Sequence, residues 1–337
     1  MKTRASLAIS RIGVRLLVAC VAVSAAGVAS AAQEEAWPQR PVTLVVPFAP
    51  GGASDFVARI IQVPLSEELK QPIVIENRAG AAGNVGMQFA ARAAPDGYTV
   101  YLGNIGTTAI NPSIFGAQLK VHPAEDFIAV NKVVDVADIL VANNDVPVKT
   151  VKDFVAYAKA RDGKLNFATP GAGSLTRLEM EVFMKLNGLN MVHVPYKGGA
   201  GPAVTDVIGG QCEVMFVSLP SAIQFVKAGR LRALGVTIPN RWPALPAVPT
   251  FLEAGYKDLV ATEWQGIFVP RGTPAPIVAR LFAVSRKVMA RPDVAEKLAM
   301  GGVLPSTSGS PEEFAAFLRS ESARWGALVK ERGISAQ

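Results

Sequence analysis

Residues 42–55 read VTLVVPFAPGGASD, and this stretch decides the fold class. The apolar run at 42–48 is typical of a buried strand, and the glycines after it lead into a segment with the apolar spacing of a helix, 53–70. The same alternation continues with strands at 72–76 and 98–103 and a helix at 82–94. Apolar strands separated by helices indicate parallel sheets covered on both faces. The sequence therefore predicts an α/β protein.

The middle of the chain repeats this pattern. A strand at 165–168 leads through the loop TPGAGS, residues 169–174, into a helix at 174–186, much as the first strand leads through PFAPGG. Further strands are expected at 191–194, 213–218 and 231–237, and helices at 151–161, 201–208 and 221–228. The last third is predicted to be helical without strands of its own. Its final helix starts at a capping box, Ser310 to Glu313, and ends at Gly333.

Two α/β lobes with mainly parallel sheets and a cleft between them follow from this repetition. We expect residues 32–138 and 255–337 to form a discontinuous lobe 1, because the C-terminal helices need a sheet to cover. Residues 139–254 then form lobe 2. The chain is expected to cross between the lobes near 133–141 and 250–264.

Residues 1–31 have the pattern of a secretory signal peptide. Four basic residues precede an apolar run over 16–28, and Ala29-Ser30-Ala31 forms a cleavage site of small residues. The stretch LVAC that ends at Cys20 resembles a lipoprotein cleavage box. Because only four apolar residues separate Arg15 from Cys20, a lipid anchor is the less favoured interpretation. We expect cleavage after Ala31 and export to the periplasm.

Charge and cysteine content exclude several classes of protein. The formal net charge of +7 falls to +3 without residues 1–31, which carry four positive charges and no negative ones. No clustered basic face remains, so we expect no nucleic-acid partner. The mature chain keeps only Cys212, so it has no intrachain disulfide, and the apolar residues around Cys212 predict a buried thiol.

Motifs of the common enzyme classes are also missing from the sequence. There is no G-x-x-x-x-G-K-[ST] loop, no G-x-G-x-x-G after the first strand and no G-x-S-x-G elbow. His122 and His193 are the only histidines, and His193 alternates with valines in a predicted strand, which indicates a structural role. No cluster has the spacing of metal ligands. We expect a protein that is not an enzyme and has no cofactor or metal, with a secreted enzyme as the alternative class.

Loops after predicted strands are the candidate ligand site, because ligands of open α/β sheets bind beyond the carboxyl ends of strands. In the loop 48–55, glycines let backbone N–H groups approach a ligand, and the helix N-terminus favours an anion. The alternative for this loop is a tight turn capped by Ser54 or Asp55. Lys197 either neutralises a ligand or is simply solvated. The candidate ligand-binding residues are Phe48, Ala49, Pro50, Gly51, Gly52, Ser54, Asp55, Asn104, Thr107, Thr169, Gly171, Gly173, Ser174, Tyr196, Lys197 and Ser218.

Short motifs along nearly the whole mature chain resemble the Bug family, the substrate-binding (TctC-like) proteins of tripartite tricarboxylate transporters. In chain order they are Trp37-Pro38, residues 45–55 (VVPFAPGGASD), 76–84 (ENRAGAAGN), 95–99 (PDGYT), 194–198 (VPYKG), 208–211 (IGGQ), 241–246 (RWPALP), 263–266 (EWQG) and 272–274 (GTP). Each motif is short, and their common order and spacing give the resemblance its specificity.

The resemblance implies a type II periplasmic-binding-protein fold that closes like a flytrap on a small carboxylate solute, without catalysis or cofactor. In the family, the loops like 48–55 and 103–108 hold waters against a ligand carboxylate, and the loop like 169–174 closes from the other lobe. The expected partners are the membrane subunits of a tripartite transporter or, alternatively, a membrane sensor kinase. We expect a monomer.

Overall fold

The computed structural model describes residues 37–335. The chain from Arg40 onward forms one compact unit, which contains every helix and strand described below. The predicted signal peptide and Cys20 lie outside the described residues. Within residues 37–335, no helix combines the length and apolar character needed to span a bilayer.

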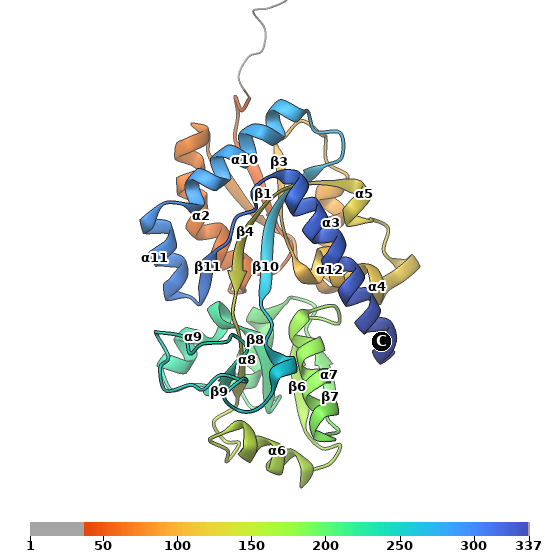
Figure 1. The fold of residues 1–337 in the computed structure, drawn as a ribbon, viewed down its shortest axis with the longest axis vertical. Helices are drawn as coiled ribbons and strands as arrows, with labels where there is room; N and C mark the ends of the chain where they lie inside the picture. Colours follow the sequence, from red (N-terminus) through yellow and green to blue (C-terminus); the bar gives the residue numbers. More distant parts are fainter. Residues whose placement is uncertain (1–36, 336–337) are drawn as a thin grey trace, which may run out of the picture. The chain divides into compact units, whose positions relative to one another are not determined.

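Lobe 1 is built on a sheet with the strand order β11-β4-β10-β3-β1-β2 (Figure 1). Its strands are β1 (Val42–Val46), β2 (Ile73–Asn77), β3 (Thr99–Asn104), β4 (Phe127–Val136), β10 (Glu263–Pro270) and β11 (Val303–Pro305). Its helices are α2 (Ala53–Leu69), α3 (Asn84–Ala91), α4 (Asn111–Phe115), α5 (Pro123–Asp126), α10 (Ala275–Met289), α11 (Pro292–Met300) and α12 (Pro311–Arg332), with short turns η1 (Ala81–Gly83), η2 (Gly106–Ile110) and η3 (Gly116–Gln118).

Lobe 2 is built on a second sheet with the order β7-β6-β8-β5-β9. Its strands are β5 (Asp138–Ala142), β6 (Asn166–Thr169), β7 (Val192–Pro195), β8 (Val214–Ser218) and β9 (Arg232–Val236). Its helices are α6 (Val151–Lys159), α7 (Leu175–Asn187), α8 (Ala200–Ile208) and α9 (Leu219–Lys227), with the turn η4 (Lys257–Leu259). Cys212 is buried in this lobe, in the apolar cluster that includes Val204 and Met215.

The sheets are mixed, so the prediction of mainly parallel sheets was wrong. β1 pairs in parallel with β2 and β3, and β6 with β7 and β8. However, β10 runs antiparallel to both β3 and β4, and β5 runs antiparallel to β8 and β9. β11 also runs antiparallel to β4. β5 and β10 are the strands that the chain forms on arriving from the other lobe, and each enters its sheet in the opposite direction to a neighbour.

The prediction that the last third has no strands was also wrong, since β10 and β11 belong to it. All of β10 is buried, although it contains Glu263, Gln265 and Gly266, and these residues hide the apolar pattern of a central strand. The crossing from lobe 1 to lobe 2 is short, because only Ala137 separates β4 from β5. The predicted domain boundaries, at residues 138–139 and 254–255, stay a proposal.

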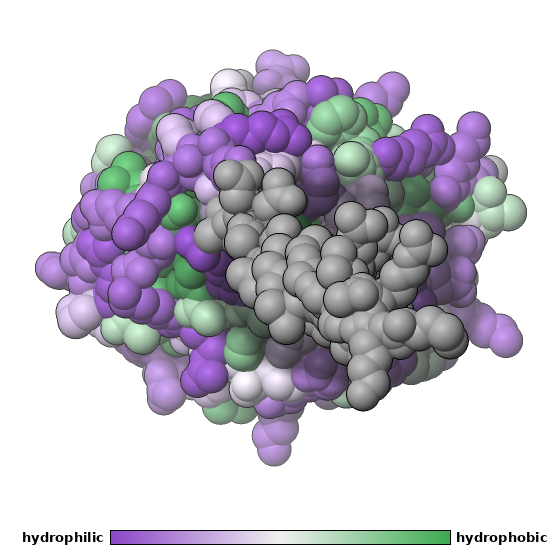
Figure 2. Space-filling view, turned by 90° about the horizontal axis from the view of Figure 1, so that it is seen from above, coloured by the Kyte–Doolittle hydropathy of each residue, from purple (hydrophilic) through white to green (hydrophobic). Residues whose placement is uncertain are grey.

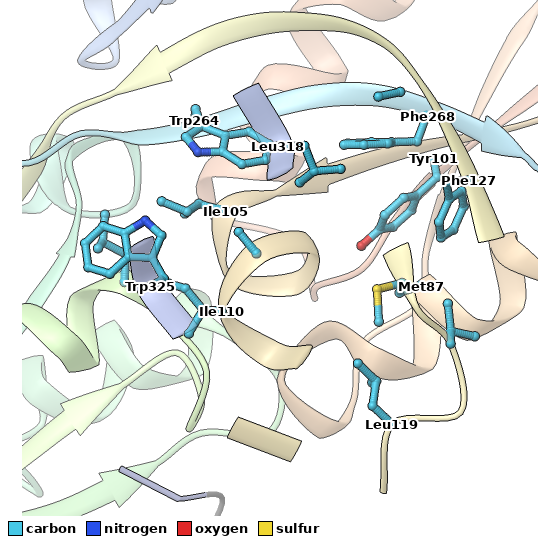
Figure 3. Close-up of a cluster of buried hydrophobic side chains, with 14 of the residues drawn as sticks. Met87, Tyr101, Ile105, Ile110, Leu119, Phe127, Trp264, Phe268, Leu318 and Trp325 are labelled. Carbon is cyan, nitrogen blue, oxygen red and sulfur yellow. The ribbon is translucent and has the colours of Figure 1, made fainter. Parts of the chain in front are cut away.

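The core of lobe 1 is aromatic and ties the C-terminal helix to the sheet (Figure 3). The rings of Tyr101 and Phe127 stack with centroids 5.2 Å apart. The indole N–H groups of Trp264, on β10, and Trp325, on α12, both donate to Oε2 of Glu321 at 3.0 Å. Buried aromatic rings with a satisfied polar atom contribute strongly to stability, so α12 is an integral part of lobe 1.

The outer surface of lobe 1 is polar where it can be seen. On the face in Figure 2, hydrophilic residues cover most of the surface outside the grey atoms, and hydrophobic residues form small separate patches. Isolated apolar side chains of this kind are normal on the surface of a protein.

Candidate ligand-binding cleft

A cavity lies between the lobes, at the carboxyl ends of β1, β3, β6 and β8. It contains about 550 Å³ of atom-free space, part of which is open to solvent. Its lining residues are Phe48, Gly52, Ala53, Ser54, Ala82, Asn104, Gly106 and Glu263 from lobe 1, and Pro170, Gly171, Gly173, Ser174, Leu175, Thr176, Ala200 and Ser218 from lobe 2. Both lobes thus contribute equally to the place where α/β proteins bind ligands.

The first turn of α2 presents backbone donors to this cavity. Gly52 is the N-cap residue of α2, and no side chain caps the helix. The first N–H groups of a helix have no partner within the helix, and the helix dipole adds partial positive charge there. Because Gly52, Ala53 and Ser54 line the cavity, the part of the cavity beside this first turn favours an anion.

Asp55 holds this loop in place and does not line the cavity. Its Oδ2 accepts the N–H of Gly51 at 3.2 Å and Nε of Arg59 at 2.9 Å, and its Oδ1 accepts Nδ2 of Asn77 at 3.1 Å. The same Nδ2 donates to the carbonyl of Phe48 at 3.0 Å. Burial acts to raise the pKa of Asp55, but these hydrogen bonds together hold that pKa below its ordinary value. A charged Asp55 therefore fixes the loop that carries the backbone donors.

The first turn of α7 is the matching element from lobe 2. Ser174 is its N-cap: the Ser174 hydroxyl accepts the N–H of Arg177 at 3.2 Å and donates to the carbonyl of Gly171 at 3.0 Å. The cap leaves the N–H groups of Leu175 and Thr176 without a partner in the helix, and both residues line the cavity. Two helix N-termini, one from each lobe, thus meet at one cavity.

Asn104 and Glu263 form the polar part of the lining on lobe 1. Nδ2 of Asn104 donates to Oε1 of Glu263 at 2.6 Å, and Oδ1 of Asn104 accepts the N–H of Thr107 at 3.0 Å. The hydroxyl of Tyr101 donates to Oγ1 of Thr107 at 2.8 Å, so Thr107 supports Asn104 from outside the cavity. Burial raises the pKa of Glu263 to about 7, although the hydrogen bond from Asn104 acts to lower it. Glu263 therefore titrates near neutral pH while it lines the cavity.

The lobes contact each other across the cleft at residues with small or absent side chains. The N–H of Ala49 in lobe 1 donates to the carbonyl of Gly198 in lobe 2 at 3.1 Å. A Cβ atom added to Gly173 would lie 1.6 Å from Oδ1 of Asn111, a distance that no contact allows. The lobes are therefore closed over the cavity, and this approach requires glycine at position 173.

Comparison with known proteins places the chain in a family. The family model described as "Tripartite tricarboxylate transporter family receptor" matches residues 57–334. The chain belongs to this family. Protein BugT of Bordetella pertussis (strain Tohama I) is 34% identical over 319 residues, which cover 94% of this chain and 97% of BugT.

Solved structures agree with the family assignment. R. palustris Rpa4515 with adipate is 35% identical, with a TM-score of 0.85 over 89% of this chain and 99% of that chain. The periplasmic binding protein BugD is 33% identical, with a TM-score of 0.85 over 89% of this chain and 100% of that chain. The predicted family and the two-lobe periplasmic-binding-protein fold are therefore confirmed, with the sheets corrected to mixed.

Half of the residues predicted for ligand binding line the cavity of this member of the tripartite tricarboxylate transporter receptor family. They are Phe48, Gly52, Ser54, Asn104, Gly171, Gly173, Ser174 and Ser218. The others surround it: Ala49, Pro50 and Gly51 lie where the lobes touch, and Asp55 and Thr107 support loops. A role for any of these residues in binding stays a prediction.

Three predicted residues of lobe 2 lie farther back. Oγ1 of Thr169 is 2.7 Å from Nε2 of His193, and burial, together with the charge of Arg177, lowers the pKa of His193 to about 4. The neutral His193 thus supports the loop after β6. The hydroxyl of Tyr196 donates to Oδ2 of Asp206 at 2.7 Å against the apolar core of lobe 2, and Lys197 is exposed.

Sequence reasoning missed half of the lining. The missed residues are Ala53, Ala82, Gly106, Pro170, Leu175, Thr176, Ala200 and Glu263. Most of them lie next to predicted loop residues in the sequence. They differ from the predicted residues only in that they offer backbone or methyl groups to the cavity. Glu263 is different, because it lies on the strand β10 that was not predicted. An acidic residue at the start of the otherwise apolar run EWQGIFVP is the signal that could have identified it.

Proposed function

We propose that this chain is a periplasmic solute-binding protein that captures a small carboxylate between its lobes and delivers it to the membrane subunits of a tripartite transporter. The observation that carries the proposal is the meeting of two helix N-termini, α2 and α7, at one cavity between the lobes. Backbone N–H groups and helix dipoles stabilise a carboxylate without a charged side chain.

Two further facts support this function. Rpa4515, a relative with the same fold and 35% identity, is described with adipate, which is a dicarboxylate. The family itself is described as the receptor of tripartite tricarboxylate transporters. Export to the periplasm follows from the predicted signal peptide, residues 1–31.

We also propose that binding involves no chemical change of the solute. The cavity lining contains no histidine, cysteine or lysine, and Ser174 and Ser218 form hydrogen bonds with backbone groups or a hydroxyl and not with a side chain that would activate a nucleophile. Nuclear magnetic resonance spectra of a bound carboxylate should therefore be the same before and after long incubation with the protein.

Calorimetric titration tests the binding function directly. Succinate, glutarate and adipate should be compared with their diamides, which keep the shape but lose the charge. We expect the best carboxylate to bind about 10- to 100-fold more tightly than its diamide, because hydrogen bonds to a charged group are the stronger ones. Equal binding of acid and amide would contradict carboxylate capture by the helix N-termini. Loss of uptake of the radiolabelled carboxylate on deletion of the gene tests the transport role separately.

A further inference from the structure

Three carboxyl groups are buried together where the chain passes between the lobes. Asp138 is the first residue of β5, Glu263 is the first residue of β10, and Glu179 lies on α7. Their exposed fractions are 0%, 8% and 4%, respectively. We call these residues the acid cluster. Glu263 lines the cavity, whereas the other two are enclosed and do not reach its lining.

Most polar atoms of the acid cluster have no hydrogen-bond partner among the described residues. Both carboxyl oxygens of Asp138, both of Glu179 and both polar atoms of Gln265 are buried without a partner among the described residues. Glu263 uses Oε1 to accept from Asn104, and no described residue donates to its Oε2. Buried carboxyl groups are costly unless they are paired or hydrogen-bonded. The cluster therefore contains several buried polar atoms that no described residue satisfies.

The acid cluster lies beside the cavity. Asp138 lies directly opposite Ser218 in the β5–β8 pair, so their side chains share one face of the sheet, and Ser218 lines the cavity. Glu263 and Gln265 share a face of β10, since side chains on a strand alternate. Within residues 37–335, no group of acidic, histidine and cysteine side chains has the arrangement of a metal site. A ligand group is thus the donor that the cavity can supply.

The cavity consequently offers two opposite kinds of surface. The first turns of α2 and α7 favour negative charge, and Glu263, backed by Asp138 and Glu179, favours a group that donates hydrogen bonds and carries positive charge. We propose that the solute carries an amino group as well as a carboxylate, and that Glu263 is the specificity-determining residue that receives the ammonium. This inference rests on the proposed function and specifies its class of ligand.

Titration of Glu263 should make the affinity for the solute depend on pH. Glu263 interacts electrostatically with two titratable groups, Asp138 on β5 and Glu179 on α7; β3 contributes the neutral Asn104 and β4 its register partner Val136. Burial, and then the neighbouring carboxyl groups, raise the pKa of Asp138 and of Glu179 well above their ordinary values. An ammonium binds best to ionised Glu263. Affinity for an aminated solute should therefore rise between about pH 6 and 8, whereas affinity for the matching solute without the amine should fall.

Calorimetry with matched ligand pairs tests the inference on the full mature chain. The pairs are adipate with 2-aminoadipate, glutarate with glutamate, and succinate with aspartate, each differing only by the amino group. For the chain length that binds best, we expect the aminated member to bind about 10- to 100-fold more tightly at neutral pH, as for hydrogen bonds to a charged group. Glu263→Gln should remove this preference and both pH slopes. Its amide oxygen can still accept from Asn104, so the fold should persist.

Glu253→Gln is the matched control, because Glu253 is half-exposed and paired with Arg241 in lobe 2, away from the cavity lining. It should leave the preference unchanged. If wild-type protein binds both members of each pair equally, or prefers the member without the amine, the inference is overturned while the proposed function stands. If no carboxylate of either kind binds, the proposed function fails and the inference with it. A preference that survives in Glu263→Gln would also overturn the role of Glu263.

Discussion

The two polar surfaces of the cavity are made in different ways. We call the first turns of α2 and α7 the donor wall. It is built from backbone groups whose partial charges do not change with pH, and its supports, Asp55 and Ser174, have their hydrogen bonds satisfied. The acid cluster is built from side chains that titrate and lack partners. The donor wall can therefore bind an anion at any moderate pH, whereas the acid cluster responds to both pH and ligand.

The largest effect that we expect concerns the acid cluster in the empty protein. An unfolded glutamate releases its proton near pH 4.5, while Glu263 in the folded chain keeps its proton up to about pH 7. Between these values the folded state binds more protons, so stability falls as pH rises. We expect Glu263 alone to account for a loss of about 3 kcal/mol in the free energy of unfolding between pH 5 and 8, measured by urea denaturation.

Glu263→Gln should reduce that slope, because glutamine does not titrate, while Asp138 and Glu179, whose pKa values are also raised, continue to contribute to it. Asp55 does not interfere: its pKa lies below its ordinary value of 3.8, so its contribution is lost only in more acidic solution. A slope that is the same in wild type and Glu263→Gln would show that Glu263 is not the group that titrates.

The sequence reveals the donor wall more readily than the acid cluster, for a physical reason. Glycine-rich turns between an apolar strand and a helix indicate backbone donors, and Gly52, Gly171 and Ser174 were predicted on that basis. The acid cluster depends on which strands cross between the lobes. Glu263 and Asp138 are far apart in the sequence and meet only because β10 and β5 enter two different sheets at the same boundary. No local pattern encodes that meeting.

In the fold, too, local features were predicted from the sequence and features that depend on distant parts of the chain were not. Parallel βαβ units were predicted with few errors, because each is local and apolar. The antiparallel strands β4 and β10 were missed, since their partners come from distant parts of the chain and β10 carries polar residues within its buried run. The direction of these strands depends on the path of the whole chain between the lobes.

Gly173→Ala should separate the two halves of the donor wall. A methyl group at this position meets Oδ1 of Asn111, whose amide nitrogen is held by the carbonyl of Ala82 at 3.0 Å and by Asn84 at 2.6 Å. Closure would then require repacking, which typically costs about 1–3 kcal/mol. We expect calorimetry to show weaker carboxylate binding by that amount and small-angle scattering to show a larger radius of gyration at saturation. Gly209→Ala, which meets only ordinary contacts, should leave both measurements unchanged.

Ala53→Pro tests a single donor of α2. Proline at the first helical position removes one N–H without breaking the helix, and the extended conformation of Gly52, with φ −89° and ψ 173°, suits a following proline. Loss of one donor to a charged ligand should cost about 1–2 kcal/mol of binding free energy. Ala53→Gly keeps the N–H and should bind nearly as well as wild type. Equal weakening by both changes would indicate that the methyl group, and not the N–H, matters to binding.

The smallest effect should come from the one cation among the predicted ligand-binding residues. Lys197 is exposed and is not part of the cavity lining, so water screens its charge from a solute between the lobes. We expect Lys197→Met to change the free energy of carboxylate binding by less than about 0.5 kcal/mol, the usual range for a surface substitution. Calorimetry at low and high salt decides between screening and direct contact. If Lys197 contacted the solute, the loss would be large at low salt and would shrink as salt is added. A loss of that kind would show that Lys197, and not the backbone of the donor wall, provides much of the binding free energy for the anion. Binding that does not depend on pH would then be explained by Lys197.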